Sequence, residues 1–359
     1  MTRAAIAIVA SALLVSARPA SAQGAGPQAT NHPWEVEGAA GIGAGSLTNG
    51  STALPAPGAP IATSSPIFPS RQTSSWMFGD GAALLNSVNA AFGLSARVQP
   101  LDSALQALGL DSTGAAVSFR VRRAISDRFS LELSVDVLSG SAHLSDTLVS
   151  ATTATRDSTK AALTALLSTG PFAAVSVDGS SSTTNGTNRE IATTGALVWR
   201  LRPSSSWSPY ATMGAGVFAG AGELPSATIQ VNYRASILGN VPIAESDHVT
   251  LHYDRQTALI GVFGGGIRHD ASSWGWRVDA RVFVGGDSPR LLLDTQPSVT
   301  TGTPAGFIES FTNPAIQFSN NSSTGRQSTL SGSMIQNFEA VSAGHETHVL
   351  VSVGVFKRF

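Results

Sequence analysis

The sequence predicts an all-β fold: an eight-stranded antiparallel up-and-down transmembrane β-barrel with long extracellular loops containing short helices. Three observations predict it. Eight segments alternate apolar and polar residues, short and long connections follow each other strictly, and most Trp residues lie near the short connections. The low share of charged residues, 13%, is also typical of a barrel that turns one face of every strand to lipid.

The N-terminus has the pattern of a cleavable secretory signal. Arg3 precedes an apolar stretch over residues 4–15, which is too short to span a bilayer, and small residues lead to a cleavage site between Ala22 and Gln23. We therefore expect an exported chain, divided into a signal peptide at 1–22, a short N-terminal segment at 23–33 and a barrel at 34–359.

The composition argues against several classes of function. The chain has no Cys, so it can form neither a disulfide nor a thiolate metal site. Its 22 Lys and Arg residues nearly balance its 23 Asp and Glu residues, which leaves no net field to attract nucleic acid. No uninterrupted apolar run has the length of a transmembrane helix, so a membrane location requires strands that close into a barrel. We expect no cofactor.

The expected strands alternate strictly, and their lengths suit tilted membrane strands of about 9–11 residues. They span residues 34–44, 115–124, 129–141, 190–201, 209–220, 257–268, 275–286 and 348–359. The facing of the two Gly-rich strands, the fifth and the sixth, stays open.

The connections predict the orientation. Those at 124–129, 201–209 and 268–275 are short, whereas the other four are long. Outer-membrane barrels have short periplasmic turns and long outer loops, so we expect both termini in the periplasm. Aromatic rings near these ends predict a periplasmic girdle, because amphipathic rings settle at the membrane boundary. Its expected members are Trp34, Phe129, Trp199, Trp207, Tyr210, Trp274, Trp276, Phe356 and Phe359.

Charged residues occupy the face opposite the apolar one. Charge facing hydrocarbon costs several kilocalories per residue, whereas charge in a narrow lumen can pair, so we expect a structural network inside the barrel. Eight strands leave an interior largely filled by side chains, which favours this filling over a conducting path. The expected network consists of Glu35, Glu37, Arg120, Arg122, Glu132, Asp136, Arg200, Arg277, Asp279 and Arg281.

The third long loop adds a question of strand number, because residues 227–236 and 248–256 also alternate. No Gly or Pro between 253 and 259 would let the chain reverse, so we interpret this hairpin as strands five and six continuing above the membrane after a break at 222–225. Eight spanning strands are therefore preferred over ten.

The first two long loops contain amphipathic helices. We expect them to begin at Asp80, at Asp102, and at Asp157 or Ser158, and to pack on one another or on the barrel rim. The stretches 44–70 and 178–188 are rich in Ser, Thr, Gly and Pro, and we expect them to be mobile.

The chain resembles the outer-membrane protein β-barrel family, the small OmpA/OmpX/OmpW-like barrels. The resemblance lies in the signal, in residues 275–281 after a short turn, in the Gly-rich strand at 210–216, and in the terminal strand ending at Phe359. It implies a bacterial outer-membrane protein whose terminal strand is read by the barrel-insertion machinery. The alternate valines before Phe359 match that signal, whereas Lys357 stands where an apolar residue is usual.

Two polar clusters could carry catalysis, since some barrels of similar architecture are proteases or lipid-modifying enzymes. One is His143 with Ser145 and Asp146, and the other is His252 with Asp254. Nucleophile and base must come within hydrogen-bond reach, which the sequence does not show, so exposed loop polarity is the preferred interpretation.

Metal binding is not expected either. His345 and His348 flank Glu346 but lack the helical zinc spacing, and on a strand residues three apart face opposite sides. His248 and His252 share a face through alternation alone.

The sequence thus predicts a non-enzymatic envelope protein among outer-membrane lipids, with a structural or surface-interaction role carried by its outer loops and a surface ligand left unidentified. Three alternatives stay open: a narrow channel or transporter for small or apolar solutes, an outer-membrane hydrolase, and a soluble secreted β protein.

Overall fold

A computed structural model describes residues 33–47, 72–106, 110–170, 172–203, 206–237, 241–254, 257–271, 273–287, 290–302, 316–321, 327–330, 338–340 and 345–359. The expected signal peptide, with Ala22 and Gln23, lies outside these residues, as does most of the stretch 44–70.

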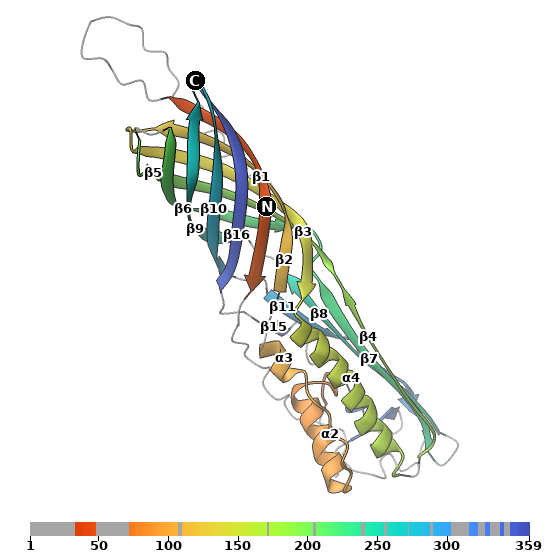
Figure 1. The fold of residues 1–359 in the computed structure, drawn as a ribbon. Helices are drawn as coiled ribbons and strands as arrows, with labels where there is room; N and C mark the ends of the chain where they lie inside the picture. The colour runs from red at the N-terminus through yellow and green to blue at the C-terminus, as the bar shows by residue number, and fades with distance from the viewer. Residues whose placement is uncertain are drawn as a thin grey trace, which may run out of the picture.

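Eight strands form a closed barrel in the order β1-β16-β10-β9-β6-β5-β3-β2, and all neighbours are antiparallel (Figure 1). This confirms the predicted fold class and strand number. Most strands run further toward the long loops than the sequence indicated. They are β1 Trp34–Leu47, β2 Leu110–Ala124, β3 Phe129–Leu144, β5 Gly186–Arg200, β6 Trp207–Ala221, β9 Ala258–Ala271, β10 Trp274–Asp287 and β16 His345–Arg358.

The first and last barrel strands close the cylinder. β1 and β16 pair from Glu35 and Arg358 at one end to Leu47 and Glu346 at the other. The Phe359 N–H donates to the Trp34 carbonyl at 2.9 Å. Both ends of the described barrel chain therefore lie at the end with the three short turns, which we call the turn end; the opposite end is the loop end.

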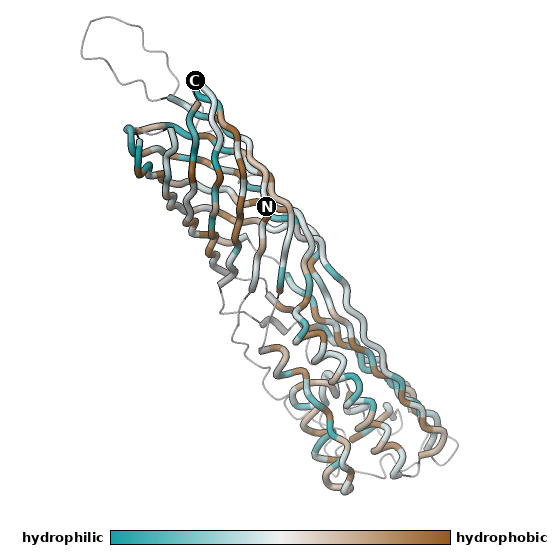
Figure 2. The backbone as a smooth tube through the Cα atoms, viewed as in Figure 1, coloured by the Kyte–Doolittle hydropathy of each residue, from teal (hydrophilic) through white to brown (hydrophobic). Residues whose placement is uncertain are grey.

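The outer face of the barrel exposes large apolar side chains on every strand. Examples are Val117 at 64% exposure, Met213 at 59% and Val353 at 56%, and apolar positions recur along the strands in Figure 2. A continuous exterior of this kind is unstable in water but suits a hydrocarbon phase. The exterior is that of a membrane-spanning barrel.

Glycine makes room for large inward side chains, which explains the Gly-rich strand β9. A Cβ at Gly266 would lie 2.8 Å from the Tyr210 hydroxyl, and one at Gly264 would lie 3.0 Å from Cγ of Arg281. The even-numbered residues of β9 thus face the lumen, while Phe263 and Ile267 are exposed outside. The same parity holds on β6, where Tyr210 and Phe218 are buried while Met213 and Val217 are exposed, so the structure settles the facing of both Gly-rich strands.

A second sheet extends beyond the loop end (Figure 1). Its strands lie in the order β15-β11-β8-β7-β4, with β12 also paired to β8. Three helices cover one of its faces and share a hydrophobic core with it; we call this assembly the outer domain. Its elements are α2 Gly79–Ala91, α3 Asp102–Gln106, α4 Asp146–Leu167, β4 Phe172–Thr184, β7 Ser226–Ile237, β8 Val241–Asp254, β11 Arg290–Thr295, β12 Ser298–Val299 and β15 Phe338–Ala340, beside the short pair β13 Thr301–Gly302 and β14 Asn320–Asn321.

The hairpin β7–β8 follows barrel strand β6 after a break at 222–225, as expected. It does not continue the barrel sheet, however, because β7 pairs with β4 and β8 pairs with β11. The expectation that residues 178–188 are mobile is wrong. They form β4 and the start of β5, since backbone pairing with β7 and with barrel neighbours orders a Ser- and Thr-rich sequence without apolar residues.

Two helix starts differ from the prediction. Helix α4 begins at Asp146, where the Ser145 hydroxyl accepts from the Leu148 N–H at 3.3 Å, and not at Asp157 or Ser158. The buried face of its first half consists largely of Thr, which gives no apolar stripe to read. Helix α2 begins at Gly79 without a side-chain cap of its own, although the Asp102 carboxylate accepts from its first N–H at 3.0 Å. None of the described helices is long and apolar enough to cross a membrane.

Candidate functional site

The barrel interior contains all ten charged residues that the sequence placed there. Nine are buried, and the Arg200 side chain is 16% exposed. Glu132 lies at the centre, with Arg281 at 2.6 Å, Arg122 at 2.7 Å and Arg277 at 3.0 Å. Three charge-assisted contacts in a low-dielectric interior hold the Glu132 carboxylate firmly in place.

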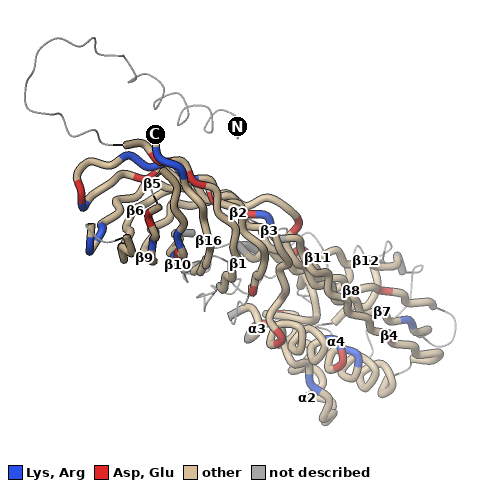
Figure 3. Tube along the Cα trace, turned by 45° about the horizontal axis from the view of Figure 1, so that its top comes forward, with Lys and Arg blue, Asp and Glu red and all other residues tan. Residues whose placement is uncertain are grey.

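Further pairs connect strands around the cylinder. Glu37 pairs with Arg277 at 2.7 Å, and Arg120 bridges Glu37 and Asp279 at 3.0 Å each. Asp136 lies 3.5 Å from Arg120. The network fills this part of the lumen with side chains. Figure 3 marks charged positions along the barrel strands.

Sequence reasoning missed three members at the turn end: Arg268, Asp270 and Arg358. Glu35 accepts from Arg268 at 2.8 Å and from Arg358 at 3.1 Å, and Asp270 lies 2.6 Å from Arg268. Arg268 and Asp270 have the same inward parity as Gly266 on β9, but the sequence left the facing of this strand open and placed Asp270 in the following turn.

The aromatic girdle needs two corrections. The rings of Trp34, Phe129, Trp199, Trp207, Trp274, Trp276 and Phe359 are exposed at the turn end, whereas Tyr210 and Phe356 are buried inside the barrel. The Tyr210 hydroxyl donates to Asp279 at 2.7 Å, and the Phe356 ring lies 4.3 Å from the Arg268 guanidinium carbon. Alternation explains the correction for Phe356, which has the parity of inward His348 and not of the outward valines. Tyr210 lies on the Gly-rich strand β6, whose facing the sequence left open. On the outer face, His269 packs on Trp207 with ring centroids 4.8 Å apart.

A second layer lies between the charges and the loop end. Nine apolar residues fill it: Ala116, Leu138, Ala192, Ala196, Phe218, Ile260, Val262, Phe283 and Leu350. Beyond it, His348 Nδ1 lies 3.4 Å from Glu190, and both side chains are buried. The barrel is thus filled by two chemically different layers.

The structure does not pair the candidate catalytic residues in the way the sequence grouped them. Ser145 caps helix α4, and His143 Nε2 lies 3.0 Å from the hydroxyl of Ser141 instead. His252 lies 3.6 Å from Asp294 on the outer sheet. Within the described residues, no group of three or more His, Asp or Glu side chains is arranged to hold a metal ion.

The outer domain contains two buried carboxyl groups. Asp247 accepts from the Trp76 N–H at 2.7 Å and from Ser75 at 2.9 Å, while Glu245 binds the Tyr233 hydroxyl. Burial raises the pKa of Asp247 to about 7 and the pKa of Glu245 well above its usual range. No described cation pairs with either carboxyl group, so burial favours the protonated form of both over the ionised form.

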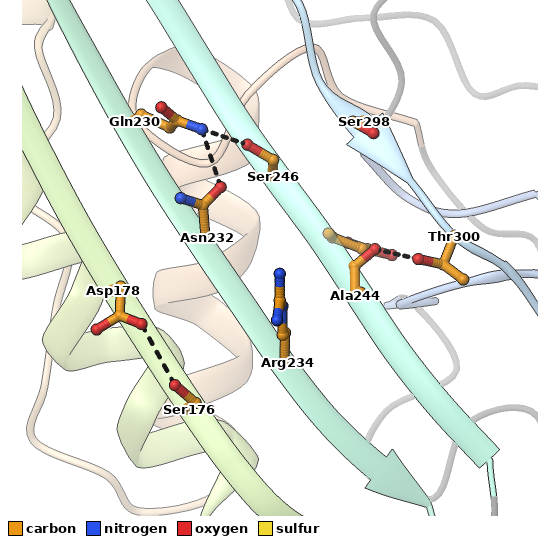
Figure 4. A pocket seen from close by; sticks show the side chains of 10 residues that line it. Ser176, Asp178, Gln230, Asn232, Arg234, Ala244, Ser246, Ser298 and Thr300 are labelled. Atoms are coloured by element: carbon orange, nitrogen blue, oxygen red, sulfur yellow. Dashed lines mark hydrogen bonds between the residues drawn. The ribbon is translucent and has the colours of Figure 1, made fainter.

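A polar groove lies on the sheet face opposite the helices (Figure 4). Its volume is about 580 Å³, and it crosses β4, β7, β8 and the segment at β12. The lining residues are Ser176, Asp178, Gln230, Asn232, Arg234, Ala244, Glu245, Ser246, Ser298 and Thr300. The sequence showed the alternation on 227–236 and 248–256 but not the strands that complete this face.

No protein-family model matches the chain, and no curated protein matches it either. Among solved structures it is similar to the outer membrane protease OmpT from Escherichia coli, with 7% identity over 93% of this chain and 99% of that one and a TM-score of 0.33. It is also similar to the translocator domain of the autotransporter NalP from Neisseria meningitidis, with 8% identity, coverage of 92% and 90%, and a TM-score of 0.25. An outer membrane channel from Pseudomonas putida has 8% identity, coverage of 94% and 100%, and a TM-score of 0.23.

Proposed function

We propose that the chain is a non-enzymatic integral protein of the bacterial outer membrane. In this proposal the barrel is an anchor, and the outer domain makes contacts at the cell surface. The observation that carries the proposal is the ion pair of Glu132 and Arg281, which spans a filled lumen while the open groove lies on the outer domain.

The exterior supports the membrane location. Apolar side chains cover the barrel wall and exposed rings collect at the turn end, as lipid-facing surfaces require. In this proposal the turn end is periplasmic, and Phe359 belongs to the strand read by the insertion machinery.

Single-cysteine labelling tests the orientation, because the natural chain has no Cys. We expect a membrane-impermeant maleimide to label a Ser180→Cys variant on intact cells. An Asp127→Cys variant, in the turn between β2 and β3, should react only after the outer membrane is permeabilised. The reverse pattern would contradict the orientation, and loss of both signals from washed membranes would contradict membrane insertion.

The surface role is tested with intact cells on immobilised polysaccharides, proteins and lipids. Cells that carry the chain should be retained on at least one surface more strongly than cells that lack it. Protease treatment that removes the outer domain but leaves the barrel should abolish the difference. Equal retention of both cell types on all surfaces would contradict the proposal.

A further inference from the structure

We propose that the groove of the outer domain binds an acidic saccharide, a hydroxyl-rich chain that carries carboxylate groups. This rests on the proposed surface role and names the ligand class for it. Three features of the groove lead to this class: an available guanidinium, a fixed amide ladder, and a lining with hardly any apolar side chain.

Arg234 provides the anion-binding group. Its side chain is exposed on β7 and lines the groove, with the Ser176 and Ala244 positions beside it in register. Among the described residues it forms no ion pair, and its neighbour Asp178 is instead within 3.3 Å of the Ser176 hydroxyl. A guanidinium presents paired N–H donors that match the two oxygens of a carboxylate.

The amide ladder beside Arg234 suits hydroxyl groups. Gln230 Nε2 donates to Asn232 Oδ1 at 3.0 Å and to the Ser246 hydroxyl at 3.2 Å (Figure 4). These bonds fix both amides, while the Asn232 NH₂ group and the Gln230 carbonyl keep no partner among the described residues. A donor and an acceptor, both pre-oriented, therefore face the groove next to the guanidinium.

The remaining lining excludes other ligand classes. Asp178 accepts hydrogen bonds from hydroxyls but repels a densely charged polyanion such as nucleic acid. Of the ten lining residues, Ala244 has the only apolar side chain, so an acyl chain or an aromatic solute would bury little apolar surface. One cation and one exposed acid among amides and hydroxyls complement a ligand that presents several hydroxyls to the groove and one carboxylate to Arg234.

The groove lies where a long ligand can reach it. Arg234 lies eight residues along β7 from Ser226, or about 26 Å of strand away from the barrel. The volume of 580 Å³ is within the range of about 300–1,000 Å³ typical of small-ligand sites, enough for a short stretch of saccharide chain. The rest of such a chain can leave the groove along the open sheet face.

The test is calorimetric titration of the full-length protein in lipid nanodiscs with three probes. Hexagalacturonate carries hydroxyls and carboxylates, maltohexaose carries hydroxyls alone, and hexaglutamate carries carboxylates alone. We expect hexagalacturonate to bind at least about tenfold more tightly than either of the others, because only this probe satisfies both the guanidinium and the amides. Absence of hexagalacturonate binding, or equal binding of hexaglutamate, would overturn the proposal.

Variants locate the binding in the groove. Arg234→Gln should weaken hexagalacturonate binding about tenfold or more. Arg234→Lys should weaken it less, because the positive charge remains while the paired N–H donors of the guanidinium are lost. Asn232→Ala should weaken it about threefold to tenfold. The matched control is Arg97→Gln, which removes an exposed guanidinium on the helical side of the outer domain and should leave the affinity unchanged. Equal effects of Arg97→Gln and Arg234→Gln would overturn the site.

Failure of this inference is distinct from failure of the surface role. If no probe binds but the protein still retains cells on an immobilised surface, the saccharide class is wrong and the surface role stands. If the probes do not bind and retention is also absent, both are wrong.

Discussion

The carboxylate of Glu132 and the guanidinium of Arg281 lie 2.6 Å apart, although their strands, β3 and β10, stand on opposite sides of the barrel. Both side chains are buried. The pair therefore spans the lumen, which the other charged side chains and an apolar layer also occupy. The ion pair of Glu132 and Arg281 thus connects opposite sides of the barrel wall and contributes to a packed lumen.

Loss of Glu132 should destabilise the barrel. In a Glu132→Gln variant, Arg122, Arg277 and Arg281 keep their charges while the central anion is gone. Removing one partner of a buried pair costs about 3–5 kcal/mol in the free energy of unfolding. Urea unfolding of the folded protein in detergent, followed by heat-modifiable gel mobility, measures this change.

A matched surface pair provides the control. Asp157→Asn removes the anion that lies 2.8 Å from Arg156 on the solvent side of α4. Exposed pairs contribute about 0–1 kcal/mol, so this variant should unfold at nearly the wild-type urea concentration. Similar shifts for the two variants would show that the lumen network adds nothing specific.

The filled lumen should not conduct. We expect planar bilayers containing the purified protein to lack stable, reproducible unitary channels, because charged and apolar layers both occupy the interior. A known porin inserted under the same conditions serves as the positive control. Reproducible conductance steps in several preparations would favour the transport alternative.

The outer domain should lose stability as pH rises. The pKa of Asp247 is raised by burial from 3.8 to about 7, and that of Glu245 is raised as well. A raised pKa in the folded state means that its stabilising contribution is complete below the unfolded value and is lost as pH rises through about 7. Protease resistance of the outer domain should therefore be greater at pH 5 than at pH 8.

An Asp247→Asn variant tests the assignment. Its amide oxygen can still accept from the Trp76 N–H and from Ser75, but it has no proton to lose. We expect a flatter dependence of protease resistance on pH. An unchanged slope would assign the pH effect to other groups.

Phe356 and Phe359 should have separable effects. Phe356 is buried at 1% exposure between Arg268 and Arg358, so Phe356→Ala should lower the free energy of unfolding by about 3–5 kcal/mol. Phe359 is 71% exposed, and Phe359→Ala should change that free energy far less.

The yield of assembled barrel gives the complementary readout. If the insertion machinery reads the terminal aromatic residue, Phe359→Ala should lower the fraction of heat-modifiable protein in cells more than it lowers stability in detergent. A normal assembled fraction for Phe359→Ala would contradict this role.

The barrel could be predicted because its physics is local. Period-2 alternation assigns each residue to one wall face, so the valines of β16 and the arginines of β2 and β10 were placed correctly from spacing alone. Phe356 was misplaced because aromatic chemistry was allowed to override parity, whereas Tyr210 lies on a Gly-rich strand whose facing the alternation left open. The unexpected start of α4 at Asp146 has another cause, since a Thr-lined buried face has no apolar signature.

The amino-acid sequence by itself determined a closed eight-stranded barrel, its long-loop and short-turn ends, and a charged interior, because alternation and turn chemistry depend on neighbouring residues. Only the tertiary structure decided that β4 pairs with β7 and β8 with β11 to make an outer sheet with a polar groove. Those pairings join distant segments through backbone N–H and C=O groups, which every sequence carries alike. For the same reason, the meeting of Glu132 with Arg281 depends on barrel closure and not on either strand alone.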